Sequence, residues 1–303
     1  MPTVLSHYLG TVRDRLRLDT SSEQEVIHEL ETHIEDKLQE LREEGLTEEE
    51  AASACVRFLG SAKSVAKQTY EAHSQGSWRQ ALFAALPHLL FAMLFILNWW
   101  QGVGWLLSMV ALILGTTIYG WWRGKPSWLF PWLGYCLLPV VATGLLLLYL
   151  PRVWSWAAII LYVPLALWLL YSVTLQTIKR DWLYCSLMLL PVTIIASWFL
   201  ALEPADVFPE QWIGRVDNFA PWIAMSLLPL GAAVAMFVRL RQRWLKLSVL
   251  AVSGLMALAI VAYYAGGRLS LPAFLALIVI MLNLLLIPAF LERRLRHRQR
   301  LTV

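Results

Sequence analysis

WRQALFAALPHLLFAMLFILN, the stretch at residues 78–98, contains one charged residue, Arg79, and is otherwise almost wholly apolar. About 20 apolar residues in a helix cross the ~30 Å hydrocarbon core of a bilayer. The stretch is therefore long enough to span a membrane. The segment before it has a very different composition, so the sequence predicts that the chain passes from water into lipid near Trp78.

The charge balance reverses at the same point. Residues 1–78 contain 8 Lys and Arg against 15 Asp and Glu, a net charge of −7, and residues 79–303 contain 17 against 6, a net charge of +11. The whole chain is 58% hydrophobic with a mean hydropathy of +0.58, which is too apolar for an ordinary soluble protein of this length. We predict an acidic helical domain over residues 1–76 and a membrane domain over residues 79–303.

Apolar stretches long enough to cross a bilayer recur through the second part of the chain. Eight are predicted, at residues 80–98, 103–122, 129–150, 153–175, 182–202, 219–238, 245–265 and 271–290. Backbone groups in lipid must bond to one another, and the alternating pattern of barrel strands is missing, so each stretch is predicted to be a helix. The expected fold class is all-α: a small cytoplasmic helical bundle followed by about eight transmembrane helices. Residues 203–218 are expected to form the one long connection.

Basic residues predict the orientation of these helices, because cytoplasmic loops are enriched in Lys and Arg. The connections after every second span contain 13 of them: Arg123, Lys125, Lys179, Arg180, Arg239, Arg241, Arg243, Lys246, Arg293, Arg294, Arg296, Arg298 and Arg300. The opposite side contains Arg152, Arg215 and Arg268. This asymmetry predicts cytoplasmic N- and C-termini, a basic tail over residues 291–303, and a candidate basic cytoplasmic face formed by Arg239, Arg241, Arg243, Lys246, Arg293, Arg294 and Arg296. Because the Met1 terminus is polar, the first span is expected to act as an uncleaved anchor.

Ionisable residues are nearly absent within the predicted spans. His88 is expected near a cytoplasmic end, hydrogen-bonded to a neighbouring helix or hydrated, and Asn283 is expected to join two helices. Intramembrane enzymes and ion-coupled carriers need buried carboxylates, lysines or nucleophile–base pairs, which the spans lack. We therefore predict no catalytic residues, no cofactor and no metal site. The three cysteines, Cys55, Cys136 and Cys185, are interpreted as small hydrophobic residues.

Helical periodicity divides the N-terminal segment into three or four helices. They are expected at residues 4–18, 22–44 and 47–60, with a fourth capped by Ser61. Capping boxes are predicted at Ser22 with Glu25 and at Thr47 with Glu50, and Gly45 and Gly60 are predicted to end helices. The expected packing residues are Leu5, Tyr8, Leu9, Val12, Leu16, Val26, Leu30, Ile34, Leu38, Leu41, Ala51, Ala54, Cys55 and Phe58.

Two chemical alternatives are disfavoured for this segment. His28 and His33 are five residues apart, which places them about 140° apart around a helix, so they do not form a pair of zinc ligands. A domain with a net charge of −7 repels phosphate, so nucleic acid is not an expected partner. His33 is expected on the packing side of its helix, as a hydrogen-bonded interfacial residue or as a reporter of pH.

Four short segments together point to a family. They are Tyr8-Leu9, Glu29-Leu30-Glu31-Thr32-His33-Ile34-Glu35-Asp36, Glu44-Gly45-Leu46-Thr47-Glu48-Glu49-Glu50-Ala51 and Phe58-Leu59-Gly60-Ser61-Ala62-Lys63. Residues 5–70 resemble the HAAS, or permease-prefix, domain. This resemblance implies a small helical cytoplasmic module that precedes membrane spans in bacteria, on uncharacterised membrane proteins and on some ABC-type permeases. Many such proteins are encoded beside PadR-like transcription regulators. The resemblance supplies no catalytic residues.

These observations predict a multi-pass protein of the bacterial cytoplasmic (inner) membrane with a regulatory or protein-interaction role. The candidate partner surface consists of Glu29, His33, Asp36, Glu40, Glu43 and Glu44, and the partner is expected to be a PadR-like regulator or a transport complex. A further hypothesis is that residues 40–50 dock on the chain's own basic face. The alternative is that the basic residues only set the topology and contact anionic lipid. The alternative function is a permease or exporter subunit for a hydrophobic or neutral substrate. Homo- or hetero-oligomers are compatible with both.

Overall fold

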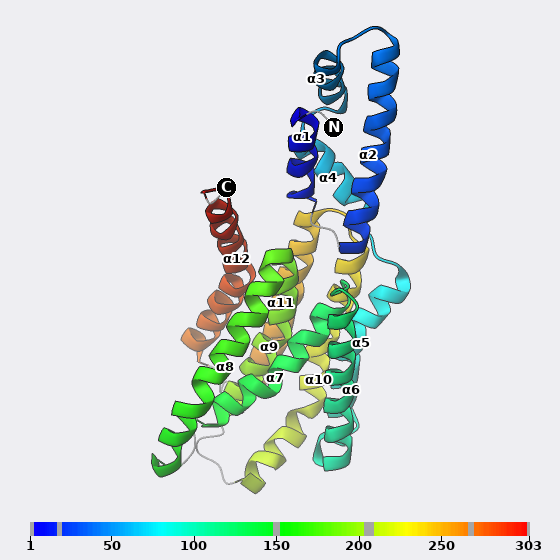
Figure 1. The fold of residues 1–303 in the computed structure, drawn as a ribbon. Coiled ribbons are helices and arrows are strands. Elements are labelled where there is room, and N and C mark those ends of the chain that lie inside the picture. Colours follow the sequence, from blue (N-terminus) through cyan, green and yellow to red (C-terminus); the bar gives the residue numbers. More distant parts are fainter. Residues whose placement is uncertain (1–2, 17–19, 148–151, 203–208, 266–269, 302–303) are drawn as a thin grey trace. The chain divides into compact units, whose positions relative to one another are not determined.

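A computed structural model describes residues 3–16, 20–147, 152–202, 209–265 and 270–301 (Figure 1). Its contacts divide the chain into two compact units, Met1–Gly76 and Ser77–Val303. The described residues form helices and connections and contain no strand. The predicted all-α class is therefore confirmed.

The N-terminal unit consists of α1 (Thr3–Arg13), α2 (Thr20–Glu43), α3 (Glu48–Leu59) and α4 (Ala62–His73). Helix α1 packs against the other three and supplies the centre of the core. The apolar stripe predicted for α1 is confirmed, because Leu5, Tyr8, Leu9, Val12 and Leu16 are all buried. Helix α1 ends at Arg13, earlier than predicted. Two hydrogen-bonded turns follow it and bring Leu16 into the core, so the apolar stripe continues beyond the helix.

Local signals at the helix ends gave mixed predictions. Thr47 caps α3 with a complete capping box, Gly60 ends that helix at φ 81°, and Ser61 caps α4, as predicted. Helix α2 begins at Thr20, so Ser22 lies inside its first turn and the predicted start is two residues late. The N-cap residue can thus be predicted from the sequence where only one short polar residue precedes the helix.

The predicted packing face of α3 is partly wrong. Ala51, Ala52 and Cys55 are buried, whereas the Phe58 side chain is 73% exposed. Periodicity alone allowed a face with either Ala52 or Ala54, and packing against α1 and α2 selected Ala52. This rotation places Phe58 outside the core.

The C-terminal unit contains eight long helices and one short 3₁₀ helix within its described residues. They are α5 (Trp78–Ile96), η1 (Trp99–Gln101), α6 (Val103–Trp122), α7 (Leu129–Leu147), α8 (Arg152–Arg180), α9 (Trp182–Ala201), α10 (Pro209–Arg239), α11 (Arg243–Tyr264) and α12 (Leu271–Leu301). Seven candidate membrane spans, in α5, α6 and α8–α12, are long and apolar enough to cross a bilayer. The remaining predicted span, 129–150, corresponds to α7, whose fully described apolar part is the shorter Leu129–Val140. These helices indicate a multi-pass membrane protein.

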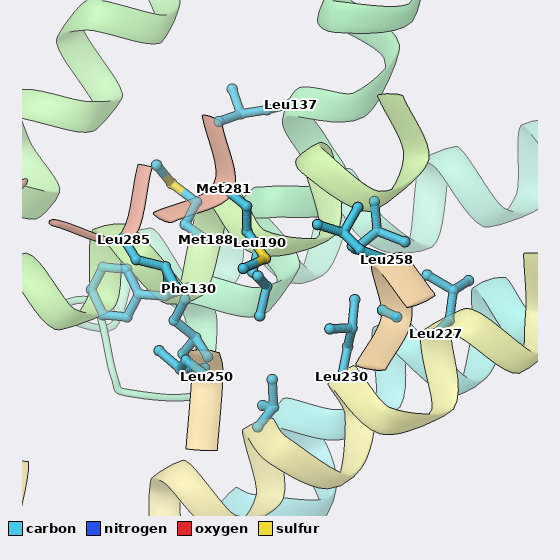
Figure 2. Packing of buried hydrophobic residues seen from close by; sticks show 14 of the residues in the cluster. Phe130, Leu137, Met188, Leu190, Leu227, Leu230, Leu250, Leu258, Met281 and Leu285 are labelled. Atoms are coloured by element: carbon cyan, nitrogen blue, oxygen red, sulfur yellow. The ribbon is translucent and has the colours of Figure 1, made fainter. Parts of the chain in front are cut away.

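Helix α9 occupies the centre of this unit (Figure 1). It contacts α7, α8, α10, α11 and α12, and apolar residues surround its axis. A helix that is apolar on every side is buried on every side. The surrounding core includes Phe130 of α7, Met188 and Leu190 of α9, Leu258 of α11 and Met281 of α12 (Figure 2).

Three helices are longer than the predicted spans. Helix α10 begins at Pro209, so the second half of the predicted 203–218 connection is helical, and Glu210 and Asp217 lie in α10. Helix α12 continues to Leu301 through the basic tail, and α8 continues to Arg180. Hydropathy marks only the part of a helix that lies in lipid, so polar helical extensions are missed by it.

Proline in a span is accommodated by a neighbouring helix. Pro87 in α5 cannot donate to the carbonyl of Phe83, one turn earlier. The Trp132 indole of α7 donates to that carbonyl at 3.0 Å. This contact ties α7 to the proline turn of α5 and satisfies a backbone group that lipid cannot satisfy.

Glycine allows α7 and α9 to approach each other closely. A Cβ atom on Gly134 of α7 would lie 2.3 Å from the backbone oxygen of Met188 and 3.0 Å from Cγ of Pro191, both in α9. No side chain fits at that distance without moving a backbone. Gly134 therefore sets the separation between α7 and the central helix.

Candidate functional site

The six predicted partner-surface residues lie along one side of α2 and just past its end. At 100° per residue, they fall within about 100° of arc over a length of about 22 Å. Each of them is exposed: Glu29, His33, Asp36, Glu40, Glu43 and Glu44. Five carboxylates on one exposed helix face form a strip of negative charge, which we call the acidic stripe. The core of the unit holds the opposite face of α2, through Ile27, Ile34 and Leu38.

The histidine of the stripe corrects one prediction. His33 was expected on the packing side of its helix, and the structure exposes it instead. Ile34 and Leu38 fill the packing positions, and His33 lies about 100° away from Ile34. A role as a buried hydrogen-bonded residue is therefore wrong for this side chain.

An exposed aromatic residue adjoins the acidic stripe. The ammonium group of Lys37 donates to Glu40 at 2.7 Å and lies 5.2 Å from the ring centre of Phe58. The hydrogen bond from Lys37 to Glu40 raises the pKa of the Lys37 side chain, so the lysine stays charged. Lys37 thus joins the stripe on α2 to the exposed ring on α3.

The turn after α2 is fixed by hydrogen bonds at the start of α3. Both the backbone N–H and the hydroxyl of Thr47 donate to the Glu50 carboxylate, and these bonds lower its pKa. Arg42 of α2 pairs with Glu48 of α3 at 2.6 Å. These contacts hold the end of the stripe, at Glu43 and Glu44, in a defined position.

The predicted basic face divides into exposed and internal residues. Arg241 is exposed and Arg239 is half-buried, with its guanidinium 4.5 Å from the Trp78 ring centre. Lys246 was predicted on this face, but the structure buries it at 1% exposure, with its ammonium 5.0 Å from the Phe237 ring centre. Helix α11 presents Lys246 to α10 rather than to the surface. Arg293, Arg294 and Arg296 lie in the helical extension of α12, and their side chains are outside the described residues.

Arg243 takes part in an ion pair that sequence reasoning missed. Its guanidinium donates to Asp181 Oδ1 at 2.6 Å, and Asp181 is 1% exposed. The same carboxylate oxygen accepts from the N–H of Leu183 and so caps the first turn of α9. An aspartate directly before an apolar helix is a recognisable cap, and this signal could have identified Asp181. The pair connects α9 to α11.

Two polar residues in the spans also depart from expectation. His88 lies ten residues after Trp78, or about 15 Å along α5, near the middle of the helix rather than at its end. It was expected either to bond to a neighbouring helix or to be hydrated, and neither ring nitrogen has a hydrogen-bond partner among the described residues. Asn283 was expected to join two helices, but it is exposed and donates to Val279 of its own helix.

Metal ligands do not gather in the described part of the chain: no group of three His, Cys, Asp or Glu residues there could hold an ion. All three cysteines are free. Comparisons with protein-family models, with curated proteins and with solved structures find no match to the chain. The resemblance of residues 5–70 to the HAAS domain therefore stays a prediction.

Proposed function

We propose that the chain is a multi-pass protein of the bacterial cytoplasmic membrane whose N-terminal unit binds a cytoplasmic protein partner. The acidic stripe of α2 and the exposed Phe58 would form the binding surface, and the C-terminal unit would hold it at the membrane. In this account the chain catalyses no reaction and needs no cofactor. A PadR-like regulator or a component of a transport complex is the expected class of partner.

One observation carries the proposal: a large exposed aromatic ring lies beside an exposed strip of five carboxylates. Protein interfaces are commonly centred on an aromatic residue that fills a pocket, with charged residues around it that guide encounter. A 73% exposed phenylalanine contributes nothing to the core of its own unit, so its removal should leave the fold intact. The matching partner surface would be basic around an apolar pocket.

The proposal is tested in native membranes with the full-length protein. Co-purified proteins are identified for the wild type, for Phe58→Ala and for the double variant Asp36→Lys with Glu40→Lys. Glu35→Lys is the control, because Glu35 is an exposed carboxylate on the same helix about 100° away from Asp36. We expect one partner to be retained by the wild type and Glu35→Lys and to be lost at least tenfold in the other two. Equal recovery with all four proteins would contradict the proposal.

Salt supplies a second readout of the same surface. Exposed charges are screened over about 8–10 Å at physiological ionic strength and over about 3 Å at 1 M. Partner retention through the acidic stripe should therefore fall as salt is raised. Retention that is independent of salt would assign the contact to apolar residues alone.

A permease or exporter subunit for a hydrophobic or neutral substrate is the second candidate. The observation that favours it is the presence of proline inside α5, α7, α8, α9, α10 and α12, since interrupted helices frequently line substrate paths. Substrate-dependent flux through vesicles that contain only the purified protein would support this function. The partner-binding proposal requires no such flux.

A further inference from the structure

Buried polar groups without a partner are concentrated in the first three helices of the C-terminal unit. Four side chains between α5 and α7 contain buried nitrogen or oxygen atoms that have no hydrogen-bond partner in the described part of the chain. They are His88, Trp100, Thr117 and Tyr135. A buried polar atom without a partner is costly, and native proteins retain few of them. A concentration of such atoms in one region therefore indicates a role beyond packing.

Of these four residues, His88 and Tyr135 contact each other. Both are 1% exposed, and their rings meet edge to face with centroids 5.1 Å apart. Phe91 lies on the other side of Tyr135, at 4.3 Å between ring centres. Gly231 of α10 faces His88 closely, since a Cβ atom there would lie 3.3 Å from the histidine Cβ. The pair thus occupies the junction of α5, α7 and α10, about 15 Å along α5 and near the middle of a ~30 Å hydrocarbon core.

The chemistry of the pair defines what it could bind. A neutral imidazole offers one donor and one acceptor, and a phenol hydroxyl offers both. Apart from His88 itself, no Asp, Glu, Lys, Arg or His occurs between Arg79 and Arg123, in α7 from Leu129 to Val140, or in α10 between Asp217 and Arg239. A charged ligand would therefore be unpaired at this depth, which is strongly unfavourable. The site suits a molecule that is small, uncharged and able both to donate and to accept hydrogen bonds.

We propose that His88 and Tyr135 form an intramembrane binding site for a small neutral hydrogen-bonding molecule, of which water is the smallest example. The proline before His88 removes a backbone donor from α5, and the glycine opposite His88 allows α5 and α10 to approach closely. The site is formed by residues of the C-terminal unit alone, so it can exist whether or not the N-terminal unit binds a protein partner.

Thermal unfolding of the full-length protein in lipid nanodiscs gives the first test. Tyr135→Phe removes only the hydroxyl. If the hydroxyl bonds to a bound molecule, its loss lowers the apparent Tm, whereas removal of a hydroxyl that is buried and unpartnered raises it. Tyr171→Phe is the control, because the Tyr171 side chain is 65% exposed and its change should leave Tm unaltered. His88→Phe should lower Tm like Tyr135→Phe, and His88→Gln, which keeps a donor and an acceptor, should restore part of the loss.

Nuclear magnetic resonance of the same samples, labelled with ¹⁵N at histidine, identifies the bound molecule. The His88 signals are assigned by their loss in His88→Gln. Transfer of magnetisation from water to the His88 ring would show bound water, and a decrease of that transfer on addition of glycerol would show that a small polyol occupies the same site. Either result supports the proposal. A rise in Tm for both Tyr135→Phe and His88→Phe, together with no transfer from water and no response to glycerol, would overturn it.

Discussion

Asp181 combines two local functions that have different physical origins. Its carboxylate caps α9 by accepting from Leu183, and it pairs with Arg243 at the first residue of α11. The cap needs only an acceptor oxygen, whereas the pair needs a negative charge. Because the carboxylate is 1% exposed, removal of Arg243 would leave a poorly solvated charge, whereas removal of Asp181 would leave a guanidinium whose side chain is 28% exposed.

Asp181→Asn separates these two contributions, since asparagine keeps a capping oxygen and lacks the charge. The Arg243 side chain that Asp181→Asn leaves without its charged partner is 28% exposed, so water compensates part of the loss and we expect the C-terminal unit to be destabilised by about 1–3 kcal/mol. Asp181→Ala should cost about 1 kcal/mol more because the cap is lost as well. Unfolding in mixed detergent micelles measures both differences. Equal stability of the wild type and Asp181→Asn would show that the pair contributes nothing.

Glu50 predicts a pH dependence at the start of α3. Its hydrogen bonds from Thr47 lower the pKa of the carboxyl below its unfolded value, so the stabilisation is present above the unfolded pKa of about 4.3 and is lost as pH falls through the folded pKa. The protection of amides in the first turn of α3, measured relative to their intrinsic exchange rate at each pH, should therefore fall in wild type on acidification below about pH 4.5. Glu50→Gln should show a smaller loss of protection over the same range. Identical pH profiles in the two proteins would contradict this account of the cap.

Residue-level prediction succeeded where the cause is local. Thr47, Gly60 and Ser61 were identified because a capping side chain or a residue with positive φ acts on its own helix end. Phe58, His33 and Lys246 were placed wrongly because the direction of a side chain depends on which helices pack around it. Helix α3 has small apolar residues on more than one side, which offers nearly equivalent apolar faces, and only tertiary contacts select between them.

At the scale of the element, close approach governs the packing of α7 against α9. The Cβ position of Gly134 lies 2.3 Å from a backbone oxygen, so Gly134→Ala forces the two helices apart. Overpacking of this kind typically costs about 1–3 kcal/mol.

Gly115→Ala is the matched control, because Gly115 is also in a membrane helix and has no atom within 4 Å of its Cβ position. Alanine there should be neutral or should stabilise α6 by about 0.5–1 kcal/mol. Thermal denaturation of both variants in one detergent measures the difference. If Gly134→Ala is as stable as Gly115→Ala, the contact between α7 and α9 is looser than the structure indicates.

Element ends in the C-terminal unit were harder to predict than element positions. Hydropathy located the apolar part of each helix, but α10 and α12 continue well beyond it into polar sequence. Asp181 was overlooked for a related reason. It follows two basic residues, so it was counted only as part of a charged connection, and its position as the cap of α9 was not considered. The His88–Tyr135 pair could not be foreseen, since the two residues are distant in sequence and meet only at a helix crossing.

At the scale of the whole molecule, the chain consists of two units that differ in the medium they suit. The charge reversal in the sequence occurs near Trp78, and the contact boundary lies between Gly76 and Ser77, where Ser77 caps α5 with its own capping box. The N-terminal unit has its own buried clusters around α1. We therefore expect residues 1–76 to fold without the membrane part.

A fragment of residues 1–76 should be helical by circular dichroism and should unfold in one cooperative transition. Leu9→Ala in the core should lower its midpoint, because burial of that leucine is lost. Phe58→Ala should leave the midpoint nearly unchanged. A fragment that melts gradually, with no baseline before the transition, would show that the unit depends on the rest of the chain.

The central claim is that a protein partner contacts the acidic stripe of α2, and site-specific photo-crosslinking in native membranes tests it most directly. A photoreactive residue is placed at His33, in the middle of the stripe, or at Glu35, which is exposed on the same helix outside the stripe. The account predicts a discrete crosslinked product from position 33. The yield of that product from position 35 should be at least several-fold lower. Equal products from both positions, or a product only from position 35, would contradict it.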